Sequence, residues 1–386
     1  LDSGSCYMRI VADENIPLLN AFFADQGEIS VYPGREIRRE HLMQADALLV
    51  RSVTKVDPAL LAGTPVRFVG TCTIGTDHLD LPGLQAAGVQ VSSAPGCNAR
   101  GVVEYVLSCL LTLSERTGKA WRSQRVGIIG VGEVGGRLAR TLQALGVDCL
   151  LCDPPRAERG KGGFVSLDDL LAQADVISCH VPLQQSGPHA TRHLLNAERL
   201  ANLAQGTWLI NSSRGPIVDN QALAALLPQR PDLQVALDVW EQEPQVDLAL
   251  VRLCALATPH VAGYSLDGKL RGTEQIYQAF CAHFKLPATL SLTELAPTSG
   301  LANLSVDEQT PADWALARAL RWVYDVRDDD ARFRAAMLSL QEDQIAKVFD
   351  QLRKHYPLRR ECSHLQLGWS NNQALPADWL AAGFSG

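Results

Sequence analysis

The chain has 386 residues, of which 46% are hydrophobic and 20% charged, and its formal net charge is −7. This length predicts two or three domains, and the composition is typical of a globular protein. The acidic balance, without any run of lysine and arginine, argues against nucleic acid and acidic membrane surfaces as partners. No apolar stretch approaches the ~20 residues that span a bilayer, so we expect no membrane partner.

The first residues and the cysteines suggest the compartment. Residues 1–7 lack the apolar core of a signal peptide, so we expect a vector-derived remnant and a native start at Met8. The ten cysteines are scattered through apolar runs. Cys149 and Cys152 have C-x-x-C spacing, but side chains three apart on a strand point to opposite faces. We therefore expect buried reduced thiols, a cytoplasmic location and no metal.

The first part of the chain alternates strand-like and helical patterns, which predicts a small parallel α/β domain. The expected strands are residues 8–13, 47–52, 67–73 and 89–95, and helical stretches between them include residues 16–27 and 79–88. A long apolar helical pattern follows at about 98–119, and a second helix is expected at about 266–285. Both helices are expected to cross between two lobes that enclose a cleft.

A glycine-rich motif opens the second lobe. The apolar run at 125–130 leads into Gly130, Gly132, Glu133, Val134 and Gly135, which fit G-x-G-x-x-G, and a helical pattern and a second strand follow. The first glycine permits a tight turn, the second leaves room for a pyrophosphate, and the third allows helix and strand to pack closely. The free amides at the helix start then face the anion. These residues predict a dinucleotide site.

Asp153 ends the second strand of this lobe, 18 residues beyond the last glycine. A carboxylate here accepts hydrogen bonds from a ribose diol and repels a 2′-phosphate, which favours NAD over NADP. Arg156 lies nearby and could soften that preference. The alternative is that Asp153 is simply a cap at the end of the strand.

Three segments place polar side chains at or just past the ends of apolar runs. They are NSSRGPIVD at 211–219, DVWEQEP at 238–244 and TPHVAGYS at 258–265. Strand ends are where open α/β sheets bind ligands. Arg214 can grip a carboxylate, His260 can take a proton near neutral pH, and Glu243 can orient the imidazole. Each has a structural alternative: a salt-bridge donor, a packed loop histidine and a solvated acid.

The ordered set of these motifs resembles the D-2-hydroxyacid dehydrogenases over about residues 8–285. The resemblance implies two Rossmann- or flavodoxin-like parallel-sheet lobes around a cleft, with Arg214, Glu243 and His260 as catalytic residues. It also implies cofactor contacts at Val181, Ser212, Ser213, Asp238 and Gly263, Asp238 lying near the nicotinamide carboxamide. Ala262 departs from the wider family, which more often has glycine there.

Within that family the chain is most similar to a member that acts on a phosphorylated substrate. This likeness implies substrate contacts at Ser52, Thr73, Tyr264 and Arg51. The substrate phosphate needs a second cationic site; Arg51 is the first candidate, and Lys55, Arg100 or a basic residue of a partner subunit are others.

The last hundred residues have a different character. A proline-punctuated connector begins after Leu286, and helical patterns are expected near 310–326 and 340–356. The resemblance implies an α+β appendage that forms a homodimer, and a regulatory ligand site is the alternative. The expected domains are therefore a substrate-binding lobe, 8–119 and 263–285, an NAD-binding Rossmann domain, 120–262, and a dimerisation domain, 286–386.

The function expected from these residues is NAD-dependent oxidation of a 2-hydroxy acid, with hydride leaving C2 and His260 taking the hydroxyl proton, and the resemblance implies that this acid is small and phosphorylated. Another dehydrogenase of the same family, such as one acting on 3-phosphoglycerate, would share every catalytic residue. A binding module that senses NAD on the same fold is the alternative from another class.

Overall fold

The computed structural model describes residues 8–297, 303–307, 309–369 and 375–385, so the expected remnant at 1–7 lies outside it. The chain forms two compact units. The first comprises residues 1–98 and 265–298, and the second comprises residues 99–264 and 299–386. Both units contain a parallel sheet, as the sequence predicts.

The first unit is a five-stranded sheet in the order β2-β1-β3-β4-β5. Its strands are β1 (Met8–Asp13), β2 (Gly27–Tyr32), β3 (Ala47–Val50), β4 (Phe68–Thr71) and β5 (Gln90–Ser92). Its helices are α1 (Leu19–Phe23), α2 (Pro58–Leu61), α3 (Leu81–Ala86), α11 (Leu266–Phe284) and α12 (Leu292–Leu295). Strand β2 was not expected, and the predicted helix at 16–27 is only the short α1.

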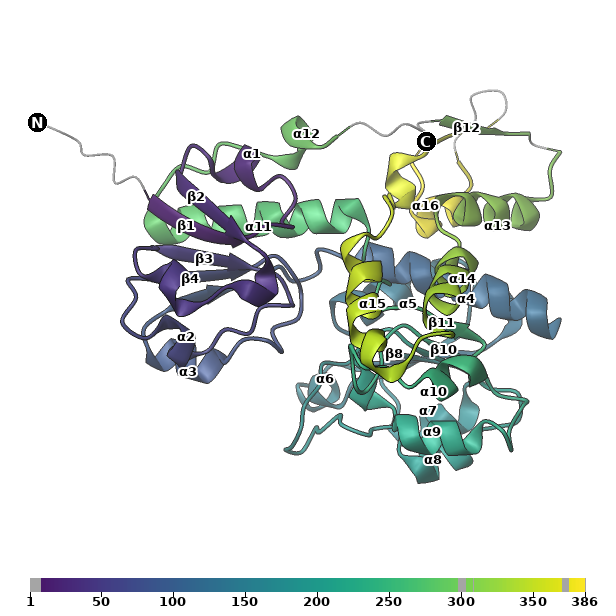
Figure 1. Cartoon of the computed structure of the whole chain (residues 1–386). Coiled ribbons are helices and arrows are strands. Elements are labelled where there is room, and N and C mark those ends of the chain that lie inside the picture. The colour runs from purple at the N-terminus through teal and green to yellow at the C-terminus, as the bar shows by residue number, and fades with distance from the viewer. Residues whose placement is uncertain (1–7, 298–302, 308, 370–374, 386) are drawn as a thin grey trace, which may run out of the picture. The chain divides into compact units, whose positions relative to one another are not determined.

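Helix α11 lies along one face of this sheet (Figure 1). Its aromatic side chains Tyr277 and Phe280 pack on Phe22, Phe23 and Phe68, with ring centroids 5.2 to 5.8 Å apart. The returning helix therefore supplies much of the core of the first unit, because a single sheet face needs an apolar partner to be shielded from water.

The second unit is built on a six-stranded sheet in the order β11-β10-β9-β8-β6-β7. Its strands are β6 (Val126–Ile129), β7 (Cys149–Cys152), β8 (Val176–Cys179), β9 (Trp208–Asn211), β10 (Gln234–Leu237) and β11 (Leu256–Ala257). Its first helices are α4 (Ala99–Thr117), α5 (Glu133–Ala144), α6 (Pro154–Glu158), α7 (Leu167–Gln173), α8 (Ala197–Ala201), α9 (Asn220–Leu226) and α10 (Leu248–Leu253).

Alternate residues of these strands face two different apolar cores. Ile128 and Ile210 belong to the core shared with α4 and α5, whereas Ile129 and Leu209 belong to the core shared with α7, α9 and α10. This period of two is that of a pleated strand buried on both faces. Helix α4, expected within the first lobe, clusters with the second unit because its apolar side chains pack in the core with α5.

The C-terminal part of the second unit contains both helices and strands, which confirms the predicted α+β character. Its helices are α13 (Ala312–Val323), α14 (Val326–Met337), α15 (Glu342–Lys354) and α16 (Ala377–Ala382), and β12 (Asn303–Val306) pairs in parallel with β13 (Gln366–Trp369). Helix α14 was not predicted. Its first turn is acidic, and only a few apolar residues such as Phe333 and Met337 mark its buried face.

The C-terminal part shares its cores with the dinucleotide domain rather than forming a separate one. Leu316 and Trp379 join the core of α4 and α5, and Phe333 and Phe349 join the core on the other side of the sheet. The fully buried Arg359 donates hydrogen bonds to the carbonyl oxygens of Ala262 (2.9 Å) and Gly101 (2.6 Å). This part of the chain therefore contacts the segment that follows His260.

Candidate active site

The turn after β6 leaves an open space at the N-terminus of α5. A Cβ atom on Gly135 would lie 1.9 Å from the carbonyl oxygen of Gly130, so helix and turn are in direct contact there. A Cβ atom on Gly132 would meet nothing within 4 Å, and no side chain caps α5. Free amides beside open space fit a pyrophosphate. Val181 lies beside this turn, because a Cβ on Gly130 would be 2.6 Å from its Cγ1.

Asp153 acts here as the cap that the sequence analysis weighed as an alternative. One carboxylate oxygen accepts from the amide of Val131 (2.9 Å), and the other accepts from the amide of Arg156 (3.1 Å) at the start of α6. A carboxylate oxygen has two lone-pair directions, so these bonds leave acceptor capacity for a ribose diol. The two roles are compatible.

The segment after β9 holds Arg214 and the two serines. Asn211, at the end of β9, accepts from the amide (3.1 Å) and hydroxyl (2.8 Å) of Ser213 and donates to the carbonyl oxygen of Arg214 (2.9 Å). The hydroxyl of Ser212 is buried and has no hydrogen-bond partner within the described residues. Such a hydroxyl needs a partner from outside the protein, which fits the predicted contact with a cofactor.

His260 and Glu243 form a hydrogen-bonded pair, as predicted. Nδ1 of His260 is 2.7 Å from Oε2 of Glu243, and the other carboxylate oxygen accepts from the amide of Trp240 (2.8 Å). A carboxylate can only accept, so the imidazole carries its proton on Nδ1 and presents Nε2 as a base. The imidazole side chain is 32% exposed.

The charge of Glu243 is stabilised by its neighbours. Burial opposes ionisation of this carboxyl, but the His260 imidazole, its hydrogen bond and the cation of Arg353 outweigh burial, so the pKa of Glu243 is lowered. A carboxylate that stays ionised can hold an imidazolium during proton transfer. Glu243 therefore has the electrostatic properties that its predicted role requires.

Asp238 holds the turn that carries His260. Its carboxylate is 1% exposed and accepts from the hydroxyl of Thr258 (2.7 Å) and from the amides of Val261 (2.8 Å) and Ala262 (3.0 Å). Its carbonyl oxygen accepts from the amide of His260 (2.7 Å), whose φ is 58°. A non-glycine residue persists in this left-handed region only where its surroundings fix it.

Burial raises the pKa of Asp238, although His260 and the hydrogen-bond donors act in the opposite direction. Both oxygens are already engaged in the described structure. The predicted contact of Asp238 with the nicotinamide carboxamide is untested and stays a prediction. What the geometry adds is a positioning role through the backbone of the His260 turn.

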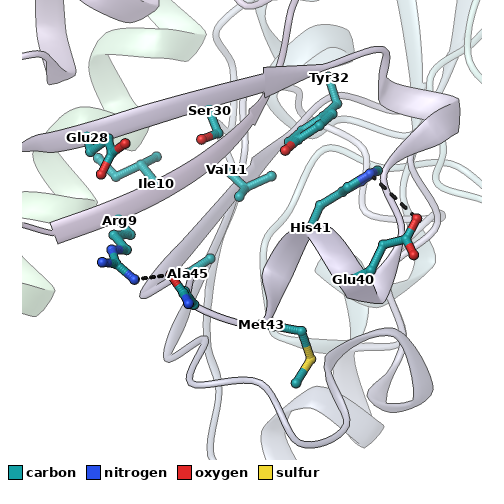
Figure 2. A pocket seen from close by; sticks show the side chains of 11 residues that line it. Arg9, Ile10, Val11, Glu28, Ser30, Tyr32, Glu40, His41, Met43 and Ala45 are labelled. Atoms are coloured by element: carbon teal, nitrogen blue, oxygen red, sulfur yellow. Dashed lines mark hydrogen bonds and ion pairs between the residues drawn. The ribbon is translucent and has the colours of Figure 1, made fainter.

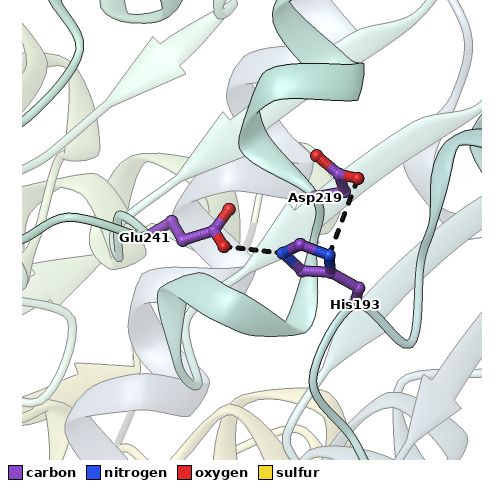
Figure 3. Close-up of side chains that lie close together, drawn as sticks. All are labelled: His193, Asp219 and Glu241. Carbon is purple, nitrogen blue, oxygen red and sulfur yellow. Dashed lines mark hydrogen bonds and ion pairs between the residues drawn. The ribbon is translucent and has the colours of Figure 1, made fainter.

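A second imidazole lies between two carboxylates beside these segments (Figure 3). Nε2 of His193 is 2.6 Å from Glu241, and Nδ1 is 3.6 Å from Asp219; the three residues form a group in the described structure whose ligand atoms lie within 4.8 Å of one another. The carboxylates face different ring nitrogens, which fits polar bridging better than coordination of one ion. The bridge joins the segment after Arg214 to the segment before Glu243.

The predicted substrate residues divide between the two units. In the first, Thr73 follows β4, and its hydroxyl is 2.8 Å from that of Thr71, while Arg51 and the exposed Ser52 follow β3. In the second, the Tyr264 ring packs edge-on against Tyr356 with centroids 5.6 Å apart.

A surface hollow of about 390 Å³ lies in the first unit, along β1, β2 and the segment 40–45 (Figure 2). Tyr32 and His41 stack there with centroids 3.9 Å apart. None of the predicted substrate residues lines this hollow. Its lining mixes Arg9 with acidic and apolar side chains, so it suits no particular ligand charge.

Comparison with known proteins identifies the family. Residues 111–262 match the family model described as D-isomer specific 2-hydroxyacid dehydrogenase, NAD binding domain, and residues 295–382 match a domain of unknown function (DUF3410). Erythronate-4-phosphate dehydrogenase of Pseudomonas savastanoi pv. phaseolicola is 58% identical over 360 residues, which cover 93% of this chain and 94% of that protein. The enzyme of that name from Pseudomonas aeruginosa PAO1 is 57% identical over 361 residues, which cover 93% and 95%.

The chain therefore belongs to the D-isomer specific 2-hydroxyacid dehydrogenase family, and the expected NAD-dependent enzyme is confirmed. The member acting on a phosphorylated substrate, to which the sequence showed its closer likeness, is erythronate-4-phosphate dehydrogenase, and that likeness is confirmed as well.

Solved structures agree on the fold. D-lactate dehydrogenase from Aquifex aeolicus, complexed with NAD and lactic acid, matches with a TM-score of 0.60 and 25% identity over 72% of this chain and 95% of that one. NAD+-bound 3-phosphoglycerate dehydrogenase from Entamoeba histolytica matches with a TM-score of 0.62, 22% identity and coverage of 72% and 96%, which supports the fold alone.

Two further findings bear on the sequence-based expectations. Within the described residues, no helix combines the length and apolarity needed to cross a bilayer. The nine cysteines in that part of the chain are all free thiols.

Some residues of the site were not predicted from the sequence. Asn211 follows an apolar run and gave a weak signal as a strand-end amide. Arg353 lies 89 positions beyond Tyr264 and resembles an ordinary cation in the last turn of an amphipathic helix. No local pattern could have placed it near the catalytic pair.

Replacing Asp238 by asparagine should loosen the turn of His260. The NH₂ group of the asparagine side chain would face the backbone N–H of Ala262 or Val261, so a buried donor would lose its acceptor. We expect the free energy of unfolding to fall by about 1–3 kcal/mol. We also expect a lower kcat, since His260 loses its fixed backbone. Chemical denaturation and steady-state kinetics measure both effects. Asp168→Asn, at a carboxylate that is 83% exposed, is the matched control. An unchanged kcat in Asp238→Asn would contradict the positioning role.

Proposed function

We propose that this chain oxidises 4-phospho-D-erythronate to 2-oxo-3-hydroxy-4-phosphobutanoate in the synthesis of pyridoxal 5′-phosphate. The substrate is inferred from relatives 57–58% identical over 93% of the chain, all named erythronate-4-phosphate dehydrogenase. The chemistry rests on one observation above the others, the 2.7 Å hydrogen bond between Glu243 and His260.

Each residue of the catalytic set performs one task in this proposal. Arg214 binds the C1 carboxylate and the C2 oxygen through its planar fork of donors. Nε2 of His260 takes the proton of the C2 hydroxyl, and the ionised Glu243 stabilises the resulting imidazolium. NAD, when bound, accepts the hydride that leaves C2. The bond to hydrogen at C2 breaks, and C2 and its oxygen become a carbonyl group.

The cofactor contacts proposed are those whose surroundings fit NAD. The open space over Gly132 and the uncapped amides of Glu133 and Val134 suit the pyrophosphate, and the unpartnered hydroxyl of Ser212 suits a polar cofactor group. Ser213, Asp238, Gly263 and the substrate contacts at Arg51, Ser52, Thr73 and Tyr264 stay predictions from the family likeness. The cytoplasmic location also stays a prediction.

The substrate test compares two phosphorylated acids that share the same reacting group. We expect NADH formation with a kcat/KM at least ~100-fold higher for 4-phosphoerythronate than for 3-phosphoglycerate. The second acid lacks the C3 hydroxyl, and a site that binds this hydroxyl rejects a ligand without it. In the matched variant His260→Ala, turnover should fall by ~10²–10⁴ while NAD affinity is kept. A preference for 3-phosphoglycerate would overturn the proposed substrate, and an active His260→Ala would overturn the mechanism.

The Glu243–His260 pair predicts a change in the pH profile. An anion beside the imidazole favours its protonated form, which is inactive as a base for oxidation. Glu243→Gln removes that charge and so no longer favours the protonated imidazole. The acid limb of kcat/KM should therefore move to lower pH. Glu241→Gln alters a carboxylate that contacts His193 instead, and it should leave this limb in place. If the acid limb of kcat/KM does not move in Glu243→Gln, Glu243 takes no part in the proton transfer.

We also propose that the C-terminal domain forms a homodimer contact. Several of the exposed large apolar side chains lie there, including Trp314 (56% exposed) and Trp322 (61%) on α13. Exposed tryptophans on one short helix are typical of interfaces. Trp322→Asp should convert a dimer into a monomer in sedimentation velocity, whereas Leu253→Asp on α10 should not. A wild-type chain that sediments as a monomer would refute this proposal.

A further inference from the structure

A cation from the C-terminal domain lies beside the catalytic pair. Arg353 occupies the last turn of α15, and its guanidinium carbon is 5.5 Å from the centroid of the Tyr264 ring and 6.0 Å from that of Phe349. Tyr264 is a predicted substrate contact, and the turn that holds it also holds His260. The C-terminal domain thus places a positive charge next to predicted binding residues.

Two aromatic rings flank this guanidinium. Its Nε is buried and has no hydrogen-bond partner among the residues that the structure describes. The Nε of Arg359, six positions further on, is also buried without a partner among the described residues, but its two terminal nitrogens donate to carbonyl oxygens, and the side chain lies 3.8 Å from Glu104. Burial opposes the charge of Arg353, but Tyr264, Glu243, Asp350 and Asp238 act in the opposite direction, so the pKa of Arg353 is raised and the cation is retained. Its Nε donor stays without an acceptor within the described part of the chain, and an additional anion would supply one.

Glu243 does not provide that anion. Its two oxygens accept from His260 and from the amide of Trp240, and no hydrogen bond joins it to Arg353 among the described residues. The cation is nevertheless near enough that its charge helps to lower the pKa of Glu243. Arg353 is therefore close to the reaction centre without forming the hydrogen-bonded ion pair that would neutralise it.

The proposed substrate carries two anionic groups, a carboxylate at C1 and a phosphate at C4. Arg214 is assigned to the carboxylate, which leaves the phosphate without a cation. The guanidinium fork matches phosphate oxygens with two parallel hydrogen bonds, and an arginine stacked on an aromatic ring keeps that fork oriented. Arg51 was the first candidate from the sequence, but it belongs to the other unit, and none of its nitrogens is among the buried unpaired atoms of the described residues.

We propose that Arg353 binds the phosphate group of the substrate and so makes the C-terminal domain a determinant of substrate specificity. This inference rests on the proposed function for the identity of the ligand. The site is made within the second unit from residues of α15 and of the turn 260–264. Tyr264 orients the guanidinium, and the phosphate supplies the acceptors that the protein does not.

The variant Arg353→Met tests this assignment because methionine keeps an apolar stem over Tyr264 and removes the charge. We expect KM for 4-phosphoerythronate to rise about 10- to 150-fold, as for lost hydrogen bonds to a charged group. The KM for unphosphorylated erythronate should not change, because that substrate has no phosphate for Arg353 to bind. In Arg353→Lys the KM for 4-phosphoerythronate should lie between those of the wild type and Arg353→Met. Lysine keeps the charge but lacks the planar fork of donors. Lys347→Ala removes an exposed charge from the same helix and should match the wild type.

Three outcomes would overturn the proposal. An equal loss with phosphorylated and unphosphorylated substrates would assign Arg353 to the catalytic groups, and so would an acid limb shifted as in Glu243→Gln. An unchanged KM for 4-phosphoerythronate in Arg353→Met would remove its role altogether. Folding of each variant is checked by its unfolding free energy, and Arg353→Lys keeps the test informative if the methionine variant is unstable.

A binding measurement separates this proposal from the identity of the substrate. Inorganic phosphate is titrated calorimetrically into the full chain saturated with NAD. We expect binding to the wild type and to Lys347→Ala, and its loss in Arg353→Met. Equal binding in Arg353→Met, or none in the wild type, refutes the phosphate site. Failure to oxidise 4-phosphoerythronate, with phosphate binding still dependent on Arg353, would instead refute the proposed substrate and keep the anion site.

Discussion

The buried carboxylate of Asp238 forms the hydrogen bonds on which the geometry of the proposed catalytic residues depends. It gathers the donors of the turn that follows β11, while the amide of Asp238 donates to the carbonyl oxygen of Asn211 at the end of β9. Three neighbouring strand ends are thereby tied together. Asn211 in turn holds the backbone of Arg214, so the backbones of Arg214 and His260 are fixed through one network. A buried network with every member satisfied is rigid.

The C-terminal domain extends this network rather than standing apart from it. Arg359 binds the carbonyl oxygen of Ala262, the residue whose amide Asp238 already holds. Asp330 of α14 accepts from the amide of Ala257 (2.7 Å) at the end of β11. The strand and the turn that position His260 are therefore fixed from both sides. Because the domain shares apolar cores with the sheet, its removal would expose those cores and release the turn together.

The sequence predicted the parts whose signal is local. Gly130, Gly132 and Gly135 follow a buried strand, and the three catalytic residues each follow an apolar run, so their positions at strand ends could be read directly. Strand β2 was missed because it forms the sheet edge and only Gly27 is buried, with Ile29 and Tyr32 partly buried, so it has no clear apolar pattern. Arg353 could not be found in this way. Its neighbours come from distant segments of the chain, and its unpaired Nε is visible only in the folded structure.

The charges of the proposed substrate and of the protein explain why the substrate site needs a second cation. The substrate proposed brings a carboxylate and a phosphate to a protein of net charge −7, and the reaction centre itself contains the ionised Glu243. Arg214 alone would leave the phosphate of the proposed substrate without a cation while Glu243 stays ionised nearby. In this proposal Arg353, stacked on Tyr264, supplies the cation for the phosphate. The ionisation of Glu243 depends mainly on His260, whose charge and hydrogen bond lower its pKa more than the charge of Arg353 does.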